Sequence, residues 1–267
     1  MGGIVSNCVN IACGNIYVPG WQNLDFSPVS VEVTRADLTG RLPLPDGQAD
    51  LVYSSHFLEH VPVDRVPGFL SECHRLLKPG AVIRLVMPDL EDICREYLAM
   101  RSIGEHDKAD FLVIELLDQC VRKQPGGQLA SVLQESGRTG LQPYILSRLG
   151  NYVDSPRSAP LSIKRIWRAL LGRCESFYLS FLLALLPSVF RQQNVSRAVV
   201  GETHAWVYDF HTVSRLLAAA GFVDILRVEA DTSRYAGFPF VPLDLDNEGR
   251  PRKGVGSLFI EAVKPCG

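Results

Sequence analysis

Short apolar runs alternate with amphipathic segments along the first ninety residues of the chain. The runs bounded by turn-forming residues predict strands at 9–13, 22–25, 50–55 and 81–87. Apolar positions three and four residues apart predict a helix over 63–77, which Pro79 and Gly80 end because proline cannot continue a helix. This alternation of strand and helix predicts right-handed crossovers and a parallel sheet.

Residues 91–200 break the alternation. Helical periodicity continues over about 90–101 and 108–123, and a stretch rich in glycine, serine and proline follows over 125–160. A long apolar helix is then predicted over 161–190. We interpret 91–200 as a helical insertion or lid rather than as another unit of strand and helix.

The alternation returns near residue 207. Asp209 can cap a helix that ends before Gly221, and apolar runs predict two closing strands at 222–228 and 256–263. The segment 230–254 between them is rich in glycine, proline and aspartate and predicts a loop. The chain is therefore divided into the first part of a sheet domain, the insertion and the second part of the sheet domain, at 1–90, 91–200 and 201–267.

Composition narrows the class of protein. The chain has 27 Lys and Arg residues and 29 Asp and Glu residues, which gives a net charge of −2. This charge lacks the excess of basic residues that is typical of nucleic-acid-binding proteins. The seven cysteines show neither a Cys-x-x-Cys pair nor zinc-site spacing, so we predict no disulfide scaffold and no metal site. This cysteine usage, with no recognisable signal peptide, predicts a cytoplasmic protein. The oligomeric state does not follow from these features.

A glycine turn and a carboxylate follow the first two predicted strands, at the sheet edge where parallel strands bind ligands. The first strand runs into Cys13-Gly14-Asn15, where glycine lets the backbone pass close to a ligand that a Cβ would clash with. Asp25 ends the second strand, and its carboxylate can accept two hydrogen bonds from ribose hydroxyls.

Further polar residues are predicted at the same edge. Asp37 and Leu38 follow Asp25 in the chain, in a position to contact an adenine edge. Ser54, Ser55 and His56 end the next strand and are predicted to face the same cleft. These residues together predict a nucleoside-binding site.

The ordered series of motifs resembles one enzyme family. Val9-Asn-Ile-Ala-Cys-Gly-Asn15 and Gly20-Trp-Gln-Asn-Leu-Asp25 resemble the first two motifs of class I S-adenosylmethionine-dependent methyltransferases, in their compact type 11-like subgroup. The blocks that resemble this family's later strands and late helix are 42–61, 76–89, 204–209 and 216–222.

This resemblance implies a Rossmann-like α/β fold with a seven-stranded, mostly parallel sheet, an antiparallel last strand and S-adenosylmethionine as the cofactor. The implied cofactor-binding residues are Ala12, Cys13, Gly14, Asp25, Asp37, Leu38, Ser54, Ser55 and His56. The turn would lie under the methionine part of the cofactor, and Ser55 and His56 would line its sulfonium side. Ala12 departs from the family, which has a glycine at this position.

Transfer to a hydroxyl acceptor also needs a base, and a histidine suits this role near neutral pH. We predict His204 as the first candidate and His56 as the second, with His211 and Asp89 as further possibilities. His204 could equally only cap or pack the late helix. The resemblance to enzymes of polysaccharide and secondary-metabolite assembly implies a sugar or other small-molecule hydroxyl, free or lipid-linked, as the acceptor.

Two other function classes stay open. A non-catalytic S-adenosylmethionine-binding or scaffold protein would share the fold, and Ala12 would be its first sign. A nicotinamide-dependent enzyme is disfavoured, because the first and last glycines of Gly-x-Gly-x-x-Gly are absent at the turn.

The most apolar window of the chain, 176–190, lacks charge and is flanked by arginines and lysines. It is shorter than a membrane span and Pro187 interrupts it, so it does not predict a transmembrane helix. Its flanking charges are typical of a helix lying on an anionic membrane surface. The alternative is a lid helix packed on the sheet domain or at a dimer interface.

Overall fold

The computed structural model describes residues 7–150, 178, 182–196 and 201–266. Within these residues, seven strands form one sheet in the order β3-β2-β1-β4-β5-β7-β6. The strands are β1 (Cys8–Ile11), β2 (Gln22–Asp25), β3 (Val33–Arg35), β4 (Ala49–Ser55), β5 (Leu77–Pro88), β6 (Val223–Val228) and β7 (Ser257–Val263). Strand β7 runs antiparallel to both β5 and β6, whereas the pairs from β3 to β5 are parallel. The predicted α/β fold, seven-stranded with an antiparallel last strand, is confirmed.

Two strands differ from the sequence-based expectation. Strand β3 was not predicted, because it has three residues of which only Val33 is buried, and no alternating pattern marks it. Strand β5 begins at Leu77 instead of residue 81. The segment Lys78-Pro79-Gly80 continues along the sheet, where the Gly80 N–H donates to the Lys264 carbonyl at 2.8 Å.

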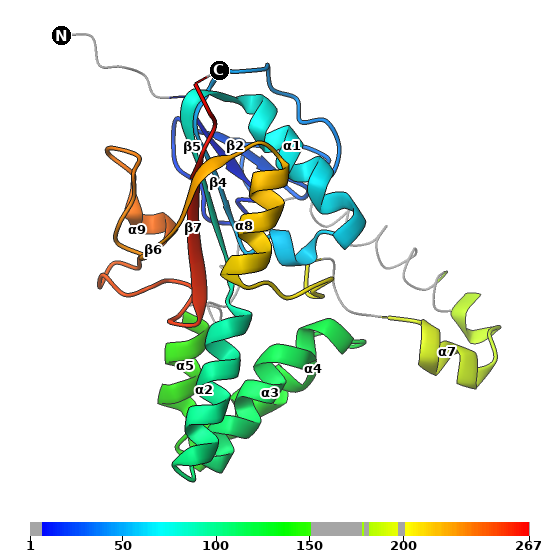
Figure 1. Ribbon diagram of the computed structural model, residues 1–267. Helices are drawn as coiled ribbons and strands as arrows, with labels where there is room; N and C mark the ends of the chain where they lie inside the picture. The colour runs from blue at the N-terminus through cyan, green and yellow to red at the C-terminus, as the bar shows by residue number, and fades with distance from the viewer. Residues whose placement is uncertain (1–6, 151–177, 179–181, 197–200, 267) are drawn as a thin grey trace.

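Helices cover one face of the sheet. After the short 3₁₀ turns η1 (Leu58–His60) and η2 (Val63–Arg65), α1 (Val66–Leu76) packs beside α8 (Phe210–Ala219) on this face (Figure 1). Both helices are amphipathic and bury their apolar stripes against the strands, which forms the larger of the cores. Asp209 caps α8 as predicted, since its carboxylate accepts a hydrogen bond from the Thr212 N–H at 2.7 Å.

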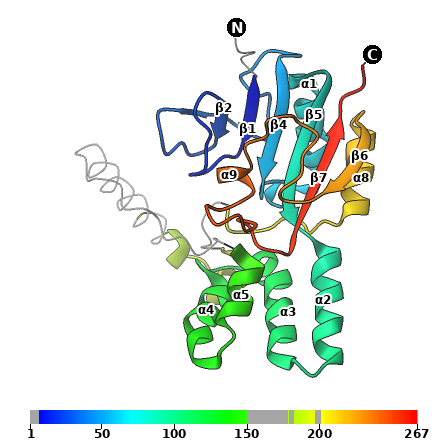
Figure 2. The ribbon, with the colours of Figure 1, turned by 90° about the vertical axis from the view of Figure 1, so that its left-hand side faces the viewer.

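A long loop covers the opposite face. The predicted loop 230–254 holds one short helix, α9 (Phe240–Leu243), and packs Phe238 and Leu243 over the strands (Figure 2). The fully buried Arg84 of β5 connects this loop to the sheet. Its Nε lies 2.7 Å from Oδ2 of Asp244 in the loop, and its Nη1 lies 2.8 Å from Oε1 of Glu261 in β7. This loop therefore takes the place of helices on that face.

The helical unit lies beyond the carboxyl ends of the parallel strands (Figures 1 and 2). It consists of α2 (Leu90–Ser102), α3 (His106–Val121), α4 (Gly127–Thr139) and α5 (Gln142–Leu149). Helices α4 and α5 fall in the stretch 125–160, which is rich in glycine, serine and proline. Gly126 and Gly140 adopt left-handed conformations at the two ends of α4, so these glycines bound the helix instead of breaking it.

The predicted apolar helix 161–190 lies mostly outside the described residues. Its described end contains Pro187, after which α7 (Ser188–Asn194) begins. No helix among the described residues is both long and apolar enough to cross a membrane.

Candidate functional site

The turn after β1 and the end of β2 meet in space. The Gly14 N–H donates to Asp25 Oδ2 at 2.8 Å, and the Ser27 N–H donates to Asp25 Oδ1 at 2.7 Å. This pairing follows from the parallel register, which places Ile11 beside Leu24 at the strand ends. The carboxylate is therefore oriented by two backbone donors and keeps lone pairs for further hydroxyl donors.

Ala12 adopts a backbone conformation that favours glycine. Its φ is +59°, in the left-handed region, and Gly14 follows with a φ of +55°. A Cβ placed on Gly14 would meet nothing within 4 Å, so the space above this residue is open. The turn thus offers a free backbone surface at the carboxyl end of β1.

The residues predicted at the adenine edge take different positions. Asp37 lies beyond the end of β3 and is exposed, and its carboxylate accepts hydrogen bonds from the Thr39 N–H and hydroxyl. These bonds lower the pKa of Asp37, the backbone bond most strongly. The Leu38 side chain is 5 % exposed and packs in the core. Neither residue lines a cavity described below.

The turn cavity encloses about 200 Å³ above the turn. The structure brings together here five of the residues predicted for the cofactor, Ala12, Cys13, Gly14, Ser55 and His56. Ser54 is buried beside them but does not line the cavity. Burial, and then the charge of Asp25, raise the pKa of Cys13 to about 12, so its thiol stays neutral.

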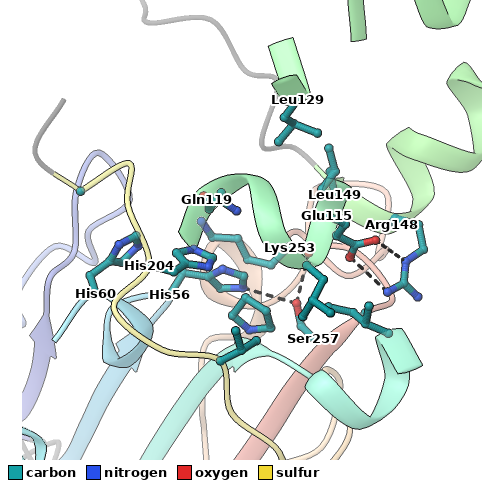
Figure 3. Close-up of a pocket in the computed structure, with 16 residues that line it drawn as sticks. His56, His60, Glu115, Gln119, Leu129, Arg148, Leu149, His204, Lys253 and Ser257 are labelled. Carbon is teal, nitrogen blue, oxygen red and sulfur yellow. Dashed lines mark hydrogen bonds and ion pairs between the residues drawn. The ribbon is translucent and has the colours of Figure 1, made fainter. Parts of the chain in front are cut away.

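The helix-side cavity encloses about 180 Å³ between the ends of the strands and the helical unit (Figure 3). Its polar lining comes from segments that are far apart in the chain. These lining residues include His56, His60, Glu115, Gln119, Arg148, His204, Lys253 and Ser257. Arg148 is held there by Asp92 at 2.6 Å and by Glu115 at 3.1 Å. Two residues, His56 and Lys253, line both this cavity and the turn cavity.

His56 is held in a strained conformation where the two cavities meet. Its φ is +51°, an uncommon value for a non-glycine residue that is often found at functional sites. Nδ1 lies 3.3 Å from Glu59 Oε1, and Nε2 lies 3.4 Å from Ser257 Oγ. Burial and then the charge of Lys253 lower the pKa of His56 to about 4, so the ring is neutral at neutral pH.

His204 lies on the wall of the helix-side cavity. Its backbone N–H donates to the Gln119 carbonyl at 2.9 Å, and its side chain is directed toward His60, with ring centroids 4.9 Å apart. Burial lowers the pKa of His204 to about 4. The further candidates lie elsewhere: Asp89 caps α2 and pairs with Arg227, and exposed His211 lines neither cavity.

Sequence reasoning missed several residues of these cavities. Lys253 comes from the glycine-rich and proline-rich loop, and no motif marks it. Burial, and then the charge of Arg252, lower the pKa of Lys253 to about 8. Arg148 and Glu115 belong to helices whose pairing no pattern in the sequence revealed. The Glu59-His60 pair was visible in the sequence, but only the fold brings it close to His204.

Comparisons with known proteins found one matching family and several similar solved structures. Residues 11–85 match the family described as "Methyltransferase domain". Among solved structures, a SAM-dependent methyltransferase from Archaeoglobus fulgidus is 14% identical, over 97% of this chain and 86% of that chain, with a TM-score of 0.41. One from Thermotoga maritima is 13% identical, over 97% and 81%, with a TM-score of 0.41. A search of curated proteins found no match.

The matched segment runs from the end of β1 into β5 and includes the turn, Asp25 and His56. The turn, Asp25 and His56 thus lie inside the family match, whereas Arg148, His204 and Lys253 lie outside it. The segment 11–85 is therefore similar to a methyltransferase domain, and the rest of the chain lies outside this match.

Proposed function

We propose that the chain is an S-adenosylmethionine-dependent enzyme that methylates a hydroxyl group of a small polar molecule, of the sugar class. The observation that carries this proposal is the meeting of the turn cavity and the helix-side cavity at His56 and Lys253. A methyl group leaving a cofactor over the turn would pass this junction to reach an acceptor in the helix-side cavity.

The residues of the turn fit the cofactor. The open space above Gly14 admits a ligand against the backbone, and the carboxylate of Asp25 can accept hydrogen bonds from ribose hydroxyls. Arg252 and Lys253 line the turn cavity and offer positive charge to the carboxylate of the methionine part. When bound, S-adenosylmethionine supplies an activated methyl group on its sulfonium.

His56 is the residue that we propose to accept the proton of the hydroxyl. It lies at the junction of the cavities, and its ring is oriented by contacts at both nitrogens. His204, the first candidate from the sequence, lines the helix-side cavity, where we place the acceptor. We propose that it contacts the acceptor rather than the cofactor.

The lining of the helix-side cavity favours a polar acceptor. Charged and hydrogen-bonding groups such as Gln119, Arg148 and Ser257 converge on a small space. A molecule with several hydroxyls can form further hydrogen bonds with such groups, which an apolar acceptor cannot. This argument supports the sugar class but not a particular sugar.

Calorimetry and a transfer assay test the proposal together. S-adenosylhomocysteine should bind the full-length protein, and labelled methyl groups should pass to one or more members of a panel of sugars and other hydroxylated molecules. His56→Gln and His204→Asn should each lower transfer at least tenfold while changing the Kd for S-adenosylhomocysteine less than threefold. His106→Asn, at an exposed site on α3, is the matched control.

Different results would redirect the assignment. Binding of S-adenosylhomocysteine without transfer to any acceptor would favour the non-catalytic scaffold protein. Absence of binding would remove the proposed function.

We also propose that the segment 176–190 contacts an anionic membrane surface, which would bring the site close to a lipid-linked acceptor. In its described part, Leu185, Val189 and Phe190 are exposed, and Arg191 follows them. Flotation with vesicles that contain anionic lipid should carry the protein with them, and replacing Val189 and Phe190 by serine should weaken this. No flotation at low salt would leave a packed lid or a dimer interface.

A further inference from the structure

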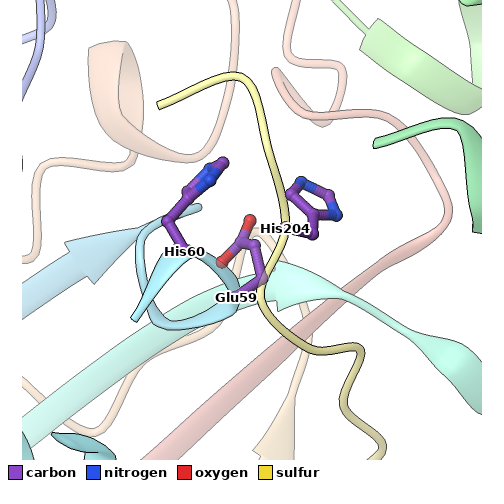
Figure 4. A group of neighbouring side chains, drawn as sticks. All are labelled: Glu59, His60 and His204. Atoms are coloured by element: carbon purple, nitrogen blue, oxygen red, sulfur yellow. The ribbon is translucent and has the colours of Figure 1, made fainter. Parts of the chain in front are cut away.

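A buried carboxylate faces two histidines beside the helix-side cavity (Figure 4). Glu59 and His60 belong to η1, and His204 lies in the segment that leads into α8. One oxygen of Glu59 and one ring nitrogen of each histidine all lie within 4.8 Å of one another. We propose that Glu59, His60 and His204 bind a divalent first-row metal ion of the zinc class.

The backbone holds the three residues in this arrangement. The N–H groups of Ala205 and Trp206 both donate to the Glu59 carbonyl, at 2.7 and 3.2 Å. The His204 N–H donates to the Gln119 carbonyl at 2.9 Å, which fixes the position of this residue against α3. Backbone hydrogen bonds between distant segments therefore hold the three residues near one another, in addition to any contact between their side chains.

The orientation of His60 is typical of a metal ligand. Its Nδ1 lies 2.8 Å from the Thr203 carbonyl oxygen, and since a carbonyl only accepts, Nδ1 carries the hydrogen. The lone pair of the neutral ring is then on Nε2. Histidines that bind metals commonly donate their other ring nitrogen to a carbonyl or carboxylate in this way, which fixes the tautomer.

The carboxylate of Glu59 provides an independent observation that points to a ligand. Its side chain is 1 % exposed, and neither carboxylate oxygen has a hydrogen bond within the described residues. The 3.3 Å contact of Oε1 with His56 Nδ1 is a charge pair only if His56 is protonated. A buried carboxylate needs a cation or hydrogen-bond donors beside it.

The donor set specifies the class of ion. Two imidazoles and one carboxylate are the protein ligands of several catalytic zinc sites, which keep a fourth position open. Ligand atoms at about 2.1 Å from a tetrahedral zinc ion are separated from one another by roughly 3.4 Å. Side-chain rotations that shift the ligand atoms by about 1 Å would bring the three residues to this separation. The same set suits Fe²⁺.

The open position of such an ion would face the helix-side cavity, because His60 and His204 both line it. A hydroxyl oxygen of the acceptor could then bind the ion, which lowers the pKa of a bound hydroxyl. This role rests on the proposed function. Binding of the ion does not depend on it.

Metal titration of the full-length protein tests the proposal. After removal of metal with a chelator, calorimetry with Zn²⁺ should show one equivalent bound, and Co²⁺ should give d–d absorption without the charge-transfer bands of thiolate ligands. Glu59→Gln and His204→Asn should each weaken Zn²⁺ binding at least a hundredfold. The matched control is the double variant Glu105→Gln/His106→Asn, an exposed Glu-His pair at the start of α3, which should bind like the parent protein.

The outcomes separate this inference from the proposed function. No tight binding of Zn²⁺ by the parent protein would overturn it, as would thiolate bands with Co²⁺ or binding that survives both substitutions in folded variants. S-adenosylhomocysteine binding is measured on the same samples, and folding is checked by circular dichroism. Cofactor binding without Zn²⁺ binding removes only the metal site. Zn²⁺ binding without cofactor binding removes the proposed function and leaves the metal site.

Discussion

The carboxylate of Asp25 gives the sharpest test of the cofactor side. Asp25→Asn keeps the shape of the side chain but removes its charge and replaces one acceptor oxygen by a donor. In the folded protein Oδ2 accepts from the Gly14 N–H at 2.8 Å and Oδ1 from the Ser27 N–H at 2.7 Å. The new amide group therefore faces a backbone donor on one side.

The expected loss in binding follows from the hydrogen bonds to ribose. Hydrogen bonds to a charged group contribute about 1.5–3 kcal/mol each, and about 1.4 kcal/mol corresponds to a factor of ten in Kd. Asp25→Asn should therefore raise the Kd for S-adenosylhomocysteine roughly tenfold to a hundredfold. The loss of one hydrogen bond to the backbone should lower the free energy of unfolding by about 1 kcal/mol.

Calorimetry with S-adenosylhomocysteine measures the first effect and urea denaturation the second. Asp64→Asn is the control, because Asp64 is an exposed carboxylate away from the turn and should change neither value. A folded Asp25→Asn variant with a Kd within twofold of the parent protein would refute the assignment of Asp25 to the ribose.

Three further predictions concern stability. Ala12→Gly should raise the free energy of unfolding by roughly 0.5–1 kcal/mol in urea denaturation. The left-handed conformation costs alanine about 1–2 kcal/mol, and the greater entropy of glycine in the unfolded chain offsets part of the gain from removing this cost. A lower stability of the variant would argue against the described turn. Gly254→Ala should lower the melting temperature much more than Gly249→Ala does. Both glycines have positive φ, but a Cβ on Gly254 would lie 1.9 Å from a backbone oxygen of α5, whereas a Cβ on Gly249 would meet nothing within 4 Å. Equal losses would contradict the docking of α5 on the loop. Asp209→Ala should cost about 1 kcal/mol at pH 7 as a lost helix cap. Hydrogen bonds from Thr212 lower the pKa of Asp209 below 3.8, so the stabilisation is present above this pH and the difference between parent and variant should shrink as the pH falls through it, whereas a constant difference would refute the cap.

The elements with strong periodicity could be predicted from the sequence, and those held only by tertiary contacts could not. The apolar stripes of α1 and α8 and the buried run of β5 are local patterns, and they appeared where expected. Strand β3 has one buried residue, and its pairing with β2 supplies what its own sequence lacks. Gly126 and Gly140 lie at the two ends of α4, so the glycine content of this stretch reflects where the helix begins and ends.

The candidate site also has a part that could be predicted from the sequence and a part that could not. The Gly14 turn and Asp25 could be predicted because each follows a strand in a family-like motif, and the parallel register then brings them together. The helix-side cavity could not, because Lys253 and Arg148 reach it from segments far apart in the chain. Its composition depends on how α5 packs against the loop before β7, where the Val255 N–H donates to the Ser147 carbonyl at 3.0 Å.

The structure of the protein with S-adenosylhomocysteine bound tests the central claim most directly. The account predicts the homocysteine part over Gly14, the ribose hydroxyls on Asp25, and the sulfur beside His56 and directed toward the helix-side cavity. A ligand whose sulfur faces away from His56 and Lys253, or one bound outside the turn cavity, would contradict it.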